Sequence, residues 1–195
     1  MKHKTLTLFH GVLLLAVISG FVTILTGCSM FSGYKQAVIT EGDISFSFEY
    51  PSSFPEPRII LGTIVTDIVL ERPDPENDRN ELDKQITVAI WKNSSYPDAL
   101  TNLEETLKQL QNHWGDFTLH ERSIINIGGL SGEKVIYSGR FEVNIFTFDH
   151  MKWQEVFLDY QGMIWIISYT SDADVTDDNA EEEFEHLINS FKFLD

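Results

Sequence analysis

Alternating apolar and polar residues predict several β-strands along this chain. The period of two expected of a half-buried strand is clearest in Ile44, Phe46, Phe48 and Tyr50, which alternate with serine and glutamate. Further strands are expected over 59–70, 85–92, 117–127 and 134–148, followed by a hairpin over 153–170 that turns at Gln161-Gly162. Residues 71–84 contain two prolines and few apolar side chains, so we expect an exposed loop there.

Two helices are predicted by apolar residues that recur every three or four positions. The first stripe consists of Leu100, Leu103, Leu107, Leu110 and Trp114. A capping box of Ser95 and Asp98 precedes it, and Glu104 and Lys108 are spaced for an ion pair on its exposed side. The second stripe follows an acidic first turn and consists of Ala180, Phe184, Leu187, Ile188 and Phe191. The elements together predict an α+β fold with an antiparallel β-sheet flanked by helices.

Several phrases of the chain carry a family resemblance. They are residues 44–51 (ISFSFEYP), 96–98 (YPD) before a helix, 127–132 (IGGLSG) before a long strand, and 189–193 (NSFKF) at the end. In their order and wording these segments resemble the proteins that share the fold of the photosystem II extrinsic protein PsbP, the nuclear-import factor Mog1 and a group of bacterial lipoproteins. The resemblance implies an α/β/α sandwich and non-catalytic work as an accessory subunit, an assembly factor or a binding module. It carries no active-site residues over to this chain.

The N-terminus has the pattern of an export signal. Lys2 and Lys4 precede a nearly continuous apolar run over 6–25, which is also close to the length of a membrane span. A retained anchor helix is therefore the alternative interpretation. The run ends in Leu25-Thr26-Gly27-Cys28, which resembles the bacterial lipobox, in which the cysteine is lipidated and becomes the first residue after cleavage. Cys28 is the only cysteine of the chain, so we expect lipid to be attached there.

The export signal and the lipobox-like motif divide the chain into a signal peptide over 1–27, a lipid-anchored tether over 28–35 and a single domain over 36–195. Loss of Lys2 and Lys4 with the signal changes the net charge from −16 to −18. Such an acidic surface repels phosphate backbones and anionic headgroups, so we expect no nucleic-acid partner. Once acylated, Cys28 supplies no thiol for a disulfide, a nucleophile or a metal site.

Candidate catalytic and metal-binding residues are few. Residues 129–133 (GLSGE) come close to a nucleophile elbow, but a strand rather than a helix is expected to follow, so a turn is the preferred interpretation. The four histidines of the mature domain are isolated from one another. Asp172, Asp174, Asp177, Asp178 and Glu183 have roughly the spacing of a calcium loop and are weak candidates for a divalent-metal site, but the turn glycine of such a loop is absent. Capping and solvation of the second helix are the preferred interpretation, so we expect no metal site.

These observations predict a membrane-anchored envelope lipoprotein, held on the extracytoplasmic side of the cell membrane through Cys28. We expect it to act as a non-enzymatic accessory or binding protein, without a cofactor and with a protein partner in the envelope. The alternative function is that of a lipoprotein that binds a small molecule or a divalent ion.

Overall fold

A computed structural model describes residues 33–73, 82–92, 94–114, 116–144, 147–174 and 179–194. Within these ranges ten strands form two antiparallel sheets. The larger sheet has the strand order β3-β4-β5-β9-β8-β7-β6, and its members are β3 (Arg58–Leu61), β4 (Val65–Pro73), β5 (Leu82–Trp91), β6 (Thr118–Ile127), β7 (Leu130–Asn144), β8 (Thr147–Tyr160) and β9 (Met163–Asp172). The smaller sheet has the order β1-β2-β10, from β1 (Tyr34–Glu41), β2 (Ile44–Pro51) and β10 (Lys192–Phe193).

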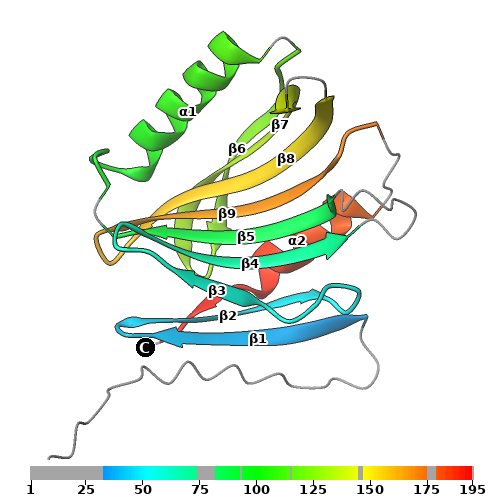
Figure 1. Cartoon of the computed structure of the whole chain (residues 1–195). Helices are drawn as coiled ribbons and strands as arrows, with labels where there is room; N and C mark the ends of the chain where they lie inside the picture. Colours follow the sequence, from blue (N-terminus) through cyan, green and yellow to red (C-terminus); the bar gives the residue numbers. More distant parts are fainter. Residues whose placement is uncertain are drawn as a thin grey trace, which may run out of the picture.

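Helices cover both faces of the larger sheet (Figure 1). Helix α1 (Ala99–His113) packs on one face through a buried cluster of Ala99, Leu103, Leu107, Val135, Tyr137, Phe157 and Ile164. Helix α2 (Ala180–Ser190) and the smaller sheet pack on the other face, where the largest buried side chains include Phe46, Phe48, Trp165, Tyr169, Phe184 and Phe191. The prediction of an α+β fold with an antiparallel sheet flanked by helices is confirmed. The smaller sheet, which shares a layer with α2, was not predicted.

The turns at one end of the domain have the geometry that their sequences predict. Gln161 and Gly162 join β8 to β9 with φ angles of 52° and 71°, as a tight hairpin turn requires. Gly128 and Gly129 join β6 to β7 with φ angles of 57° and 89°. Positive φ is a conformation that glycine adopts without steric cost, which explains the glycines at positions 128, 129 and 162.

Two predicted strands prove to be pairs of strands. The expected strand over 59–70 is divided into β3 and β4, which pair with each other around a turn at 62–64. A Cβ at Gly62 would lie 2.3 Å from the Val65 carbonyl oxygen, so this turn requires glycine. The expected strand over 134–148 is likewise divided, because β7 ends at Asn144 and β8 begins at Thr147.

Two boundaries also differ from the prediction. The expected loop over 71–84 is shorter, since β4 continues to Pro73, β5 begins at Leu82, and Lys84 is 4% exposed. Strand β1 begins at Tyr34, two residues before the expected start of the domain, and pairs along its whole length with β2. Residues 34 and 35 of the expected tether are therefore part of the smaller sheet.

Helix α1 begins differently from the predicted capping box. Asp98, rather than Ser95, is the N-cap residue of the helix. Its side chain accepts a hydrogen bond from the Thr101 amide at 2.7 Å. The stripe over Leu103, Leu107, Leu110 and Trp114 faces the sheet as predicted. Leu100 does not belong to it, because its side chain is 50% exposed.

Candidate functional site

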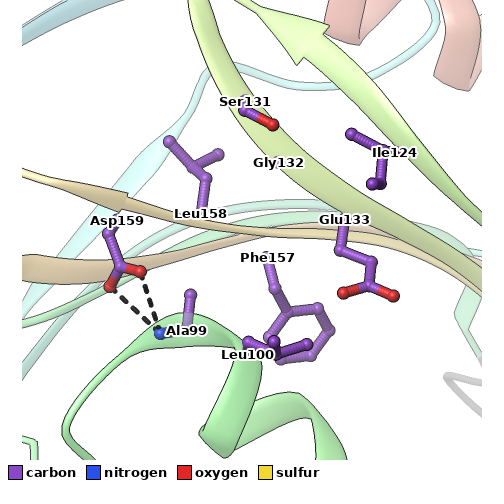
Figure 2. A pocket seen from close by; sticks show the side chains of 9 residues that line it. All are labelled: Ala99, Leu100, Ile124, Ser131, Gly132, Glu133, Phe157, Leu158 and Asp159. Carbon is purple, nitrogen blue, oxygen red and sulfur yellow. Dashed lines mark hydrogen bonds between the residues drawn. The ribbon is translucent and has the colours of Figure 1, made fainter.

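A pocket of about 220 Å³ lies between the start of α1 and strands β6, β7 and β8. Figure 2 shows the side chains around it, from Ala99, Leu100, Ile124, Ser131, Gly132, Glu133, Phe157, Leu158 and Asp159. The sheet register places Ile124 opposite Glu133, and Glu133 opposite Phe157, so three neighbouring strands present one row of side chains to the pocket. Helix α1 closes the remaining side with Ala99 and Leu100.

The helix start is held in place by a strand carboxylate. Both Asp159 carboxylate oxygens accept from the Ala99 amide, at 3.0 and 3.2 Å (Figure 2). The first amides of a helix have no partner within the helix, and a negative charge there is favourable for the helix dipole. Asp159 thus fixes the distance between α1 and β8, and this distance sets the width of the pocket.

The pocket is open to solvent, and two of the side chains at its rim are apolar and exposed. Ile124 on β6 is 79% exposed and Leu100 on α1 is 50% exposed, whereas Phe157 beneath them is 3% exposed. A β-branched residue as exposed as Ile124 is unusual on a strand, because burial of one such side chain is worth about 1.5–3 kcal/mol. Ile124 and Leu100 therefore offer apolar area that a ligand or partner would bury.

Charged side chains beside the pocket form one small network. The Arg122 guanidinium donates to Glu133 through Nε and to Glu104 through an Nη at 2.5 Å. These two carboxylates raise the pKa of Arg122 above its usual value, the hydrogen bond to Glu133 contributing most. The bond to Glu104 joins β6 to α1. The predicted pair of Glu104 with Lys108 does not form, since Lys108 contacts Glu105 instead, at 3.4 Å.

A buried carboxyl group lies on the same face of the sheet, farther along α1. Glu155 is 8% exposed and accepts hydrogen bonds from the Tyr137 hydroxyl at 2.8 Å and the Ser168 hydroxyl at 2.7 Å. Burial raises the pKa of Glu155 above its usual value, and the two hydrogen bonds oppose part of that shift. The three residues come from β8, β7 and β9, so their proximity depends on strand pairing, and we did not predict it from the sequence.

We expect the buried Glu155 to make folding stability fall as pH rises. Its pKa is raised in the folded protein, so the stabilisation is complete below the unfolded pKa near 4.5 and is lost as pH rises through the folded pKa. Glu155→Gln, which stays neutral, should remove this contribution. The difference in unfolding free energy between variant and parent should then change with pH by at most about 1.4 kcal/mol per unit.

Urea denaturation at pH 4 to 8 measures this difference. Glu105→Gln is the control, because hydrogen bonds from Gln109 and Lys108 lower the pKa of Glu105, so its difference curve should have the opposite sign. Parallel curves for Glu155→Gln and the parent would show that Glu155 is ionised in the folded protein as readily as in the unfolded chain.

Three of the five weak metal-ligand candidates lie within the described residues, and Glu183 has other partners than Asp172 and Asp174. Glu183 lies on the side of α2 that faces the larger sheet. Its carboxylate pairs with the Lys84 ammonium group at 3.0 Å and accepts a hydrogen bond from the Tyr169 hydroxyl. Asp174 binds His150 at 2.8 Å, and Asp172 accepts from the Asp174 amide at 2.7 Å. Asp177 and Asp178 lie outside the described residues. Among those described, no group of three or more ligating side chains could hold a metal ion.

The remaining sequence candidates have structural partners. The expected turn lies at Gly128-Gly129, and Ser131 is already in β7, so a strand rather than a helix follows the turn, as the sequence predicts. The histidines are spread over the domain, as expected, and bond to four different partners, which are Gln109 for His113, Ser138 for His120, Asp174 for His150 and Glu49 for His186. Cys28 lies outside the described residues. Of the helices that the structure describes, none has the length and apolar character to cross a membrane.

Comparisons with solved structures bear on the fold. The cyanobacterial PsbP protein (CyanoP) of Synechocystis sp. PCC 6803 superposes with a TM-score of 0.51 at 13% identity, over 86% of this chain and 98% of that one. The fold is PsbP-like. LpqN of Mycobacterium tuberculosis, described as involved in cell envelope biogenesis, gives a TM-score of 0.48 at 14% identity, over 84% of this chain and 93% of its own. No protein-family model and no curated protein sequence matches the chain.

Proposed function

We propose that this protein is a lipid-anchored envelope protein whose domain binds another component without catalysing a reaction. The observation that carries the proposal is the short distance from the lipobox cysteine to the folded domain. Five residues lead from Cys28 to Gly33, and β1 begins at Tyr34. An extended segment of this length spans at most roughly 17 Å, so lipid on Cys28 would hold the domain close to the membrane surface.

The tether enters at one end of the domain, and the pocket lies at the other. Strand β1 runs from Tyr34 to Glu41, a length of about 26 Å at the usual rise of a strand. Its far end lies beside the Gln161-Gly162 turn, together with Lys92 and Met163. We call this the distal end. Asp159 and the start of α1 directly adjoin it (Figure 1), so a domain anchored through Cys28 would present the pocket away from its attachment point.

Two further features support a binding role. Leu100 and Ile124 are exposed apolar side chains at the rim of the pocket, and exposed apolar area is a common property of protein-interaction sites. The PsbP-like fold agrees with the resemblance, which implies accessory or binding work rather than catalysis.

Binding of a small molecule is the second candidate function. It is favoured by an open pocket of about 560 Å³ at the distal end, lined by Glu41, Gly42, Asp43, Ile44, Lys92, Gln161 and Met163, which has the volume of known ligand sites. Native mass spectrometry of the full chain from its own membranes distinguishes the candidates. A retained small molecule that is lost on Met163→Trp would favour this second function.

We expect Cys28→Ser to abolish both lipid attachment and removal of residues 1–27. The serine hydroxyl cannot form the thioether, and the acidic domain has little attraction for anionic headgroups. Palmitate labelling and detergent phase partitioning of the full chain measure the result. Ser29→Ala is the matched control and should label like the parent. A Cys28→Ser protein that still carries palmitate and loses its N-terminal segment would contradict lipid anchoring at Cys28.

A further inference from the structure

We propose that the outer edge of β6 and the adjoining pocket bind an extended, basic segment of a partner protein, which adds a strand to the larger sheet. This inference rests on the proposed binding function and specifies the chemistry of the partner. It is carried by three features of the described residues, namely an edge strand, a pocket of limited size and an excess of negative charge.

Strand β6 is the last strand of the larger sheet, and β7 is its one hydrogen-bonded strand neighbour in the part of the chain described. Every second residue of an edge strand directs its amide and carbonyl outward, where an extended peptide can pair with them. The register of β6 with β7 is regular from Glu121 to Ile127, and the only irregularity lies between Leu119 and Glu121. The regular part includes Ile124, so the pairing edge runs directly past the pocket.

The pocket has the size of a side-chain site. Its volume of about 220 Å³ is below the range of roughly 300–1,000 Å³ that holds drug-sized ligands. A side chain from a strand added beside β6 would cross Ile124 to reach the pocket, because side chains on one face of neighbouring strands lie next to one another. Leu100 would contact the same side chain from α1. Such a side chain must be long and have an aliphatic stem.

The carboxylates around the pocket favour a side chain that ends in a positively charged group. Asp98, Glu104, Glu133 and Asp159 lie at the start of α1 and along the adjoining strands, and the described ion pairs place one cation among them, Arg122, between Glu104 and Glu133. Glu133 lies one strand inward from Ile124 and Asp159 two strands inward. A lysine or arginine combines an apolar stem with a terminal cation and fits both requirements. The net charge of −16 further favours a basic partner.

Fluorescence anisotropy with a defined peptide tests this proposal on the full chain, purified in dodecyl maltoside micelles. The probe is a labelled, capped peptide of sequence Thr-Val-Thr-Lys-Thr-Val-Thr. Three relatives are compared with it, in which norleucine or glutamate replaces the lysine, or proline replaces both the valine and the threonine that precede the lysine. We expect each relative to bind at least about tenfold more weakly, since norleucine and glutamate lack the cation and proline cannot donate to the ladder.

Two variants of the protein locate the binding site. Ile124→Arg places a positive charge at the pocket on a side chain that is 79% exposed, so folding should be retained while the lysine peptide binds at least about tenfold more weakly. Leu119→Arg is the matched control, because Leu119 lies on the same strand beyond the irregularity and is 43% exposed. It should bind like the parent, and the melting temperature of both variants should match the parent.

Equal binding of the lysine and glutamate peptides, or equal effects of Ile124→Arg and Leu119→Arg, would overturn the proposal. Unchanged binding of the proline peptide would overturn strand addition. Lipid on Cys28 is measured separately in the same protein. A protein that carries this lipid but does not bind the lysine peptide would contradict the docking surface alone. A protein that binds the peptide but carries no lipid would contradict lipid anchoring alone.

Discussion

Lys84→Met should lower the unfolding free energy of the domain by about 3 kcal/mol, because it leaves the largely buried Glu183 carboxylate without its cation. The Lys84 side chain is 5% exposed, and its ammonium group lies 3.0 Å from the Glu183 carboxylate, which is 14% exposed. The Tyr169 hydroxyl remains as a donor to Glu183 but carries no charge. The pair joins α2 to β5, so its loss also weakens the attachment of the helix to the sheet.

Chemical denaturation of the parent and variants measures this effect. Lys108→Met is the control, since the Lys108 side chain is 68% exposed and its pair with Glu105 should be worth about 1 kcal/mol or less. The double variant Lys84→Met with Glu183→Gln should recover much of the loss, because no unpaired charge is then buried. A Lys84→Met protein as stable as Lys108→Met would show that Glu183 reaches solvent in the folded protein.

Leu103→Ala should destabilise the domain by about 2–5 kcal/mol, because it leaves a cavity beneath α1. Leu103 is fully buried and belongs to the cluster that includes Val135, Tyr137 and Phe157. Leu100→Ala is the matched control, one helical turn earlier and 50% exposed, and should change stability by no more than about 0.5 kcal/mol. Equal losses for the two variants would mean that α1 is rotated about its axis relative to the described packing.

Local patterns predicted the elements whose signals lie within a few residues. The alternation in β2, the apolar stripe of α2 and the Gln161-Gly162 turn each specify their structure through neighbours along the chain. The turn between β3 and β4 was missed because its one marker, Gly62, lies within an apolar run. Strand β10 has only two residues, too few to show any period.

The candidate site was less predictable because it depends on which strands are neighbours. Leu100 fits the apolar stripe of α1 in sequence, yet the stripe actually buried begins at Ala99 and continues through Asn102 and Leu103. Ile124 has the pattern of a core strand residue, and only its place on the edge strand exposes it. Glu155 had a weak signal, namely an acidic residue at an inward position of the apolar strand segment over 153–158.

We propose that lipid on Cys28 anchors this domain, and the mass of the N-terminal peptide of the protein isolated from its own membranes tests this anchoring most directly. We predict that the peptide begins at Cys28 and carries a diacylglyceryl group on the cysteine sulfur. A peptide in which the Gly27–Cys28 bond is intact and Cys28 is unmodified would contradict the proposal and favour a retained membrane helix over 6–25.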